Sequence, residues 1–115
     1  MEGLIGRIPP HSIEAEQSVL GAMIVNKEAI NTAIEIIKPD DFYKEANKEI
    51  FEAIIVLFNR NEPVDLITLS EELKRRDTLE NIGGVTYLAN LSSGVATTAN
   101  TKYYCKIVEE KSTLR

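Results

Sequence analysis

The strongest constraint on the fold is the spacing of apolar residues, which recur every three or four positions in several segments. The clearest case is residues 44–61, KEANKEIFEAIIVLFNRN, whose apolar side chains fall on one broad face of a helix. They are Ile50, Phe51, Ile54, Ile55, Leu57 and Phe58. Because so wide a face packs against more than one neighbour, we expect 44–61 to be the central helix. No run of residues alternates with a period of two, so the sequence predicts an all-α fold.

Three side chains are well suited to begin further helices, because their oxygens accept hydrogen bonds from free backbone N–H groups at a helix N-terminus. They are Ser12, Asn26 and Asp65. The helices that follow them are expected over 13–25, 27–37 and 66–76. Pro39 ends the second of these helices.

Glycines delimit the later part of the chain. Gly83 is expected in the left-handed conformation after a short helix, and Gly94 closes a helical stripe that begins at Val85. A last helix is predicted over 99–115, with Thr98 as its possible cap. The sequence thus predicts a compact bundle of about six helices.

The predicted organisation has three parts: a flexible N-terminal arm (1–11), a globular helical head (12–98) and a last helix (99–115). The arm has no sustained period and contains two adjacent prolines. The apolar stripe of 99–115 reaches Arg115 without a glycine or proline to stop it. The last helix therefore looks cut off rather than finished.

Composition narrows the classes of function. A formal charge of −5, spread over mixed acidic and basic residues, disfavours a domain that binds nucleic acid through phosphates, and favours protein partners. The single cysteine, Cys105, excludes a disulfide framework and fits a reducing cytoplasm. No window approaches the roughly 20 apolar residues that a membrane span needs.

No segment carries a convincing chemical site. The only histidine, His11, is followed closely by Glu14 and Glu16, and a small metal-dependent or acid/base hydrolase is the alternative that this cluster offers. Glu16, however, points to another side of the helix at about 100° per residue, so the three side chains do not converge. A phosphate-binding loop is missing from the sequence. We therefore assign no catalytic, cofactor-binding or metal-binding residue.

Smaller features have structural explanations. Adjacent carboxylates at 40–41, 71–72 and 109–110 are expected to be solvated. Gly21 lies in an apolar helix face, where glycine is costly, so another backbone is expected to approach it closely. Tyr103 and Tyr104 are suited to stack on bases, which keeps a small single-stranded DNA-binding module as an alternative, although no basic groove accompanies them.

Five segments, taken in order, resemble the N-terminal domain of the DnaB family of bacterial replicative DNA helicases. They are RIPPHSIEAEQSVLGAMI, PDDFYKEANKEIFEAI, PVDLITLSEELKRR, IGGVTYLANL and ANTKYYCKIVEEKSTLR. The resemblance covers about residues 7–115. It implies that 99–115 is the start of a C-terminal helical hairpin, with the last helix as the first arm of a hairpin that is truncated at Arg115. Three positions depart from the family pattern: Asn47 replaces a common histidine, Ala96 a common proline and Cys105 a usual alanine.

The resemblance implies a non-catalytic collar domain that serves subunit assembly and recruits primase. Full-length members are hexameric helicases at the replication fork, with ATP and Mg bound by a motor domain that follows this one. The dimer is a building block of the hexamer, and a helicase loader and single-stranded DNA in the central channel are further partners. The motor lies beyond the 115 residues, so no catalytic residue of the family is carried over.

From the position of the stripe on the last helix, we expect five side chains to make subunit contacts. They are Tyr103, Tyr104, Ile107, Val108 and Leu114.

Overall fold

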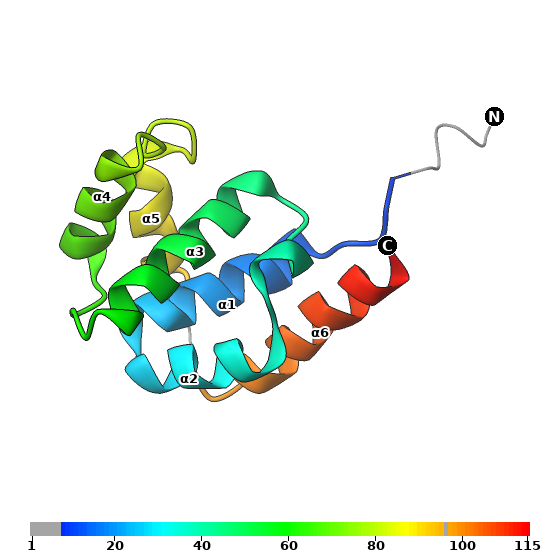
Figure 1. The fold of residues 1–115 in the computed structure, drawn as a ribbon. Helices are drawn as coiled ribbons and strands as arrows, with labels where there is room; N and C mark the ends of the chain where they lie inside the picture. Colours follow the sequence, from blue (N-terminus) through cyan, green and yellow to red (C-terminus); the bar gives the residue numbers. More distant parts are fainter. Residues whose placement is uncertain (1–7, 96) are drawn as a thin grey trace.

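The computed structural model describes residues 8–95 and 97–115, and in these ranges all regular secondary structure is helical, which confirms the predicted all-α fold (Figure 1). The elements are α1 (Ile13–Val25), α2 (Lys27–Ile36), the 3₁₀-helix η1 (Pro39–Asp41), α3 (Glu45–Asn59), α4 (Leu66–Arg75), α5 (Gly84–Ser93) and α6 (Thr101–Leu114). Residues 1–7 of the predicted arm lie outside the described residues. No helix in the described part of the chain is long and apolar enough to cross a membrane.

The three predicted N-caps are confirmed. Ser12, Asn26 and Asp65 accept hydrogen bonds from backbone N–H groups in the first turns of α1, α2 and α4, at 3.2, 2.9 and 2.9 Å respectively. Asn26 also ends α1, so a single residue separates the first two helices. These helix starts depend on contacts within four residues, which explains why the local sequence predicts them.

Several helix ends use a residue with positive φ. Asn61 after α3 and Asp77 after α4 both have φ of 61°, and Gly83 has φ of 112°. Gly83 follows a turn in which the Ile82 N–H donates to the Thr78 carbonyl oxygen at 3.1 Å. The predicted left-handed glycine is therefore confirmed, but the short helix expected before it is not formed: residues 79–83 make turns, and Gly83 is the N-cap residue of α5. Asn and Asp tolerate this conformation better than most residues with a Cβ.

The predicted Thr98 cap of the last helix is wrong. Asn100 occupies the N-cap position of α6, without a side-chain cap hydrogen bond. The Thr98 hydroxyl instead accepts a hydrogen bond from the side-chain amide of Asn26 at 2.9 Å, and its carbonyl accepts one from the Thr101 hydroxyl at 2.8 Å. The Thr98 side chain is therefore engaged by a residue distant in sequence and not by the first turn of the helix that follows it. Ala96, in the same connection, lies outside the described residues.

The central helix is α1, which corrects the expectation that 44–61 fills this role. Helix α1 contacts α2, α3, α5 and α6, and it runs through the middle of the bundle in Figure 1. Eight of its 13 residues are buried, on several sides of the helix. Three of the eight are small: Ala15, Gly21 and Ala22. Small side chains let neighbouring helices approach from several directions, whereas α3 contacts α1, α4 and η1.

The close approach expected at Gly21 is confirmed. A Cβ built on Gly21 would overlap the backbone carbonyl oxygen of Leu91 in α5 and a side-chain methyl of Val95. Glycine therefore allows α1 and α5 to pack backbone against backbone, and this packing offsets the low helix propensity of glycine.

Candidate functional site

The outer face of α6 carries an exposed apolar stripe. Tyr103 is 67% exposed, Ile107 36% and Leu114 62%. Separations of four and seven residues place these three side chains on one face of the helix. Tyr104 is half-buried, and Val108 is 2% exposed and packs in this chain's own core. Of the five residues predicted to make subunit contacts, the structure thus gathers three on the open face, which we call the α6 stripe.

A shallow hollow of about 310 Å³ lies beside the α6 stripe, between α6 and the first turns of α1. It is lined by Ser12, Glu14, Ala15, Ser18, Tyr104 and Ile107. Ile107 therefore belongs to both the stripe and the hollow, and Tyr104 contributes to the hollow from its half-buried position. Together the stripe and the hollow form a surface of mixed apolar and small polar groups.

The C-terminal end of α6 is fastened to two segments that are distant in sequence. The guanidinium of Arg115 donates hydrogen bonds to the carbonyl oxygens of Pro10 at 2.9 Å and Asp41 at 2.7 Å. The Ser112 hydroxyl donates to the Asp41 carboxylate at 2.7 Å. The Arg115 guanidinium also lies 5.5 Å from the centre of the Tyr43 ring. These contacts fix the direction of α6 relative to η1 and to the segment before α1.

The possible cluster of His11, Glu14 and Glu16 is not assembled. The His11 ring stacks on Tyr43 with centroids 4.0 Å apart, and its Nδ1 lies 2.8 Å from the Pro9 carbonyl oxygen. Glu14 is exposed, whereas Glu16 is 1% exposed. Within residues 8–95 and 97–115, no group of three or more His, Cys, Asp or Glu side chains is placed to hold a metal ion. The geometry thus gives no support to the hydrolase alternative.

Glu16 has a structural role that sequence reasoning missed. Its carboxylate accepts hydrogen bonds from the backbone N–H of Tyr43 at 2.7 Å and from the Asn47 side-chain amide at 2.9 Å, with the Lys44 N–H at 3.4 Å. Glu16 therefore holds the segment that leads into α3 and places a carboxylate near the N-terminus of that helix, where Lys44 at the N-cap position makes no side-chain cap bond. The N-cap position of α3 holds no Asp, Asn, Ser or Thr, and this absence is the sign in the sequence that a side chain from elsewhere interacts at this helix start.

The hydrogen-bond chain continues from Glu16 into α5. The Tyr87 hydroxyl donates to the Asn47 side-chain oxygen at 2.6 Å, and it accepts from the Gln17 side-chain amide at 3.3 Å. Asn47 thus uses its amide toward Glu16 and its oxygen toward Tyr87. We call these four side chains the Glu16 network; it joins α1, α3 and α5. The described residues contain no buried side-chain nitrogen or oxygen without a partner.

Charged side chains also join α3 to α4. Arg76 donates to Glu49 at 2.5 Å and to Glu52 at 2.9 Å, and the Arg76 hydrogen bond lowers the pKa of Glu49. Glu72 is 5% exposed and pairs with Arg60 and Arg75. The expectation that both carboxylates at 71–72 are solvated is therefore wrong for the second, because two guanidinium groups compensate its burial.

Cys105 is fully buried in α6, and burial raises the pKa of its thiol to about 12. The thiol is therefore protonated at neutral pH and unreactive, as expected for a small helix residue that packs in the core.

The arrangement has a counterpart among known proteins. A family model described as DnaB-like helicase N terminal domain matches residues 8–110. The chain belongs to this family. The crystal structure of the N-terminal domain of DnaB helicase from Mycobacterium tuberculosis superposes with a TM-score of 0.91 at 47% identity, covering 94% of this chain and 78% of that chain. The resemblance in the sequence and the all-α architecture are both confirmed.

Curated relatives are longer than this chain. Replicative DNA helicase DnaC of Bacillus subtilis (strain 168) is 50% identical over 109 residues, and Replicative DNA helicase DnaB of Geobacillus stearothermophilus is 53% identical over 109 residues. In each case the match covers 95% of this chain and 24% of the relative. The chain is thus a DnaB-like helicase N-terminal domain that spans about a quarter of these relatives' length.

Proposed function

We propose that the chain is the collar domain of a replicative DNA helicase, which assembles subunits and recruits primase. The observation that carries the assembly role is the α6 stripe: Tyr103, Ile107 and Leu114 expose apolar side chains on one face of a helix whose opposite face is buried. Exposed apolar side chains that are aligned on one face favour contact with another protein surface. Family membership and the names of the curated relatives support the helicase context.

The other partners follow from the same context. In this proposal, DNA unwinding, ATP hydrolysis and Mg binding belong to a motor domain outside these residues, and the complete protein is a cytoplasmic hexamer built from dimers. Primase, through its C-terminal region, and a helicase loader bind the assembled protein, and single-stranded DNA passes through its channel. In this proposal the chain contributes binding contacts to other proteins, and the catalytic residues belong to the motor domain.

The assembly role is tested by the molar mass of the 115-residue chain in light scattering over a concentration series. We expect the mass to rise above the monomer's 12.8 kDa, and Ile107→Asp to keep it at 12.8 kDa because a charge in the α6 stripe opposes burial. Ile67→Asp is the matched control, since Ile67 is 77% exposed on α4. A mass of 12.8 kDa for the unaltered chain at every concentration contradicts the assembly role.

The primase role is tested in a longer protein that also carries the motor. Deleting residues 1–115 from that protein should abolish primase binding in a pull-down assay and weaken hexamer formation. Normal assembly together with normal primase binding after the deletion overturns the proposed function.

A further inference from the structure

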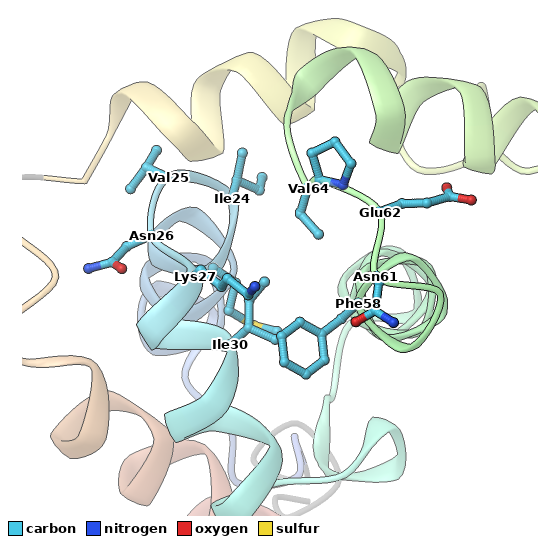
Figure 2. Close-up of a pocket in the computed structure, with 11 residues that line it drawn as sticks. Ile24, Val25, Asn26, Lys27, Ile30, Phe58, Asn61, Glu62 and Val64 are labelled. Carbon is cyan, nitrogen blue, oxygen red and sulfur yellow. The ribbon is translucent and has the colours of Figure 1, made fainter.

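A cavity opens at the end of α1 that is remote from the Glu16 network. It has a volume of about 530 Å³, within the range of roughly 300–1,000 Å³ that is typical of small-molecule sites. Its walls come from the α1–α2 corner and from the end of α3 with the connection to α4 (Figure 2). The apolar lining is Met23, Ile24, Val25, Ile30, Phe58, Pro63 and Val64. The polar lining is Asn26, Lys27, Asn61 and Glu62.

Several residues that line the cavity are held in place by core packing or by hydrogen bonds. Met23 and Ile30 are each 1% exposed and form part of the core. On one wall, Asn26 is held by hydrogen bonds to the Glu28 N–H and the Thr98 hydroxyl. On the other wall, the left-handed Asn61 donates its N–H to the Phe58 carbonyl oxygen at 3.0 Å. Such a cavity is formed before any ligand arrives, which lowers the entropic cost of binding.

The polar groups of the cavity are arranged asymmetrically. In Figure 2 the Lys27 side chain extends over the cavity toward Ile30 and Phe58, whereas the Glu62 carboxylate points away from it. Within residues 8–95 and 97–115, no carboxylate lies within ion-pair distance of the Lys27 ammonium. The side chain of Asn26 is already engaged with Glu28 and Thr98. Lys27 is thus the charged group at the cavity that is available to a ligand.

We propose that this cavity binds a small organic acid, with an aromatic or branched apolar body in the cavity and a carboxylate paired with Lys27. The volume accommodates an apolar body of about two fused rings, and the apolar lining favours its transfer from water. The ammonium selects an anion over a neutral or cationic ligand of the same shape. The α6 stripe contributes no lining residue, so this binding function is separate from the proposed assembly role.

The test uses two probes with the same apolar body, 1-naphthylacetate and the uncharged 1-naphthylacetamide, titrated into the 115-residue chain. Methyl NMR shifts of Ile24, Ile30 and Val64 locate the site, and calorimetry gives the affinities. We expect the carboxylate to bind about threefold more tightly than the amide, as for a partly exposed ion pair. In Lys27→Gln this preference should vanish, whereas Lys74→Gln on α4 should retain it.

A second variant tests the cavity itself. Val64→Trp fills the space and should weaken both probes at least tenfold, while Ile67→Trp, on the exposed face of α4, should leave both affinities unchanged. Circular dichroism checks that each variant is folded. Equal affinities of the two probes in the unaltered chain, a preference that survives Lys27→Gln, or shifts confined to methyl groups elsewhere would each overturn the proposal. None of these results bears on the molar mass that tests the assembly role.

Discussion

The two ends of α1 lie in opposite kinds of surroundings. Near its first turn, Glu16 and Gln17 take part in a closed set of hydrogen bonds with α3 and α5. Near its last turn, Met23, Ile24 and Val25 border an open, largely apolar cavity. The first end fixes the relative positions of three helices through directional bonds, whereas the second borders space that the described residues leave open. Helix α1 thus contributes to a hydrogen-bonded contact between three helices at one end and to the proposed ligand site at the other.

The largest expected effect is at the bonded end. Glu16→Ala removes the acceptor for the Tyr43 backbone N–H, just before α3, and for the Asn47 side-chain amide, so these donors lose their partner. We expect the free energy of unfolding to fall by about 3 kcal/mol, measured by urea denaturation. Glu14→Ala, an exposed carboxylate in the same turn, should change it by less than about 0.5 kcal/mol. Equal effects of the two variants would show that the Glu16 network contributes little stability.

A smaller effect is expected where the same network reaches α5. Tyr87→Phe deletes one hydroxyl and leaves the buried side-chain oxygen of Asn47 without its donor. The free energy of unfolding should fall by about 1 kcal/mol in the same denaturation assay. Tyr103→Phe removes a hydroxyl from a side chain that is 67% exposed, and it should have no measurable effect. A similar loss in both variants would contradict the assigned role of Tyr87.

The smallest effect is expected at the open end. Val64→Leu adds one methylene beside the cavity, where there is room, and should change the free energy of unfolding by less than about 0.5 kcal/mol. The same enlargement in the packed core, Val19→Leu, should cost about 1–3 kcal/mol because Val19 is fully buried. Thermal or urea denaturation of both variants checks the contrast. If Val64→Leu destabilised the chain as much as Val19→Leu, the cavity would not be open in solution.

What the sequence predicts well is what depends on neighbouring residues. Ser12, Asn26 and Asp65 cap the helices that follow them, and Gly83 is left-handed, because each outcome is decided within one helical turn. The apolar period also predicts the all-α class, and the ordered motifs identify the family.

What the sequence predicts poorly depends on residues far apart along the chain. Glu16 bonds to the Asn47 side chain 31 residues later, and Thr98 pairs with Asn26 across 72 positions. Glu72 is buried because Arg60, from the end of α3, reaches it. No local pattern specifies such partners, since a carboxylate on a helix has the same appearance in the sequence whether it faces water or another helix. The placement of Val108 in the core is of the same kind, because it depends on α1 and α2.

The Asn26 side chain links the α1–α2 corner by a hydrogen bond to the segment just before α6. Its oxygen fixes the first turn of α2, while its amide is bonded to Thr98, three residues before α6 begins. The Asn26–Thr98 hydrogen bond therefore holds this corner directly against the segment that leads into α6. The corner also borders the cavity. The Asn26 side chain therefore connects the wall of the cavity to the segment that precedes α6, the helix that carries the exposed stripe.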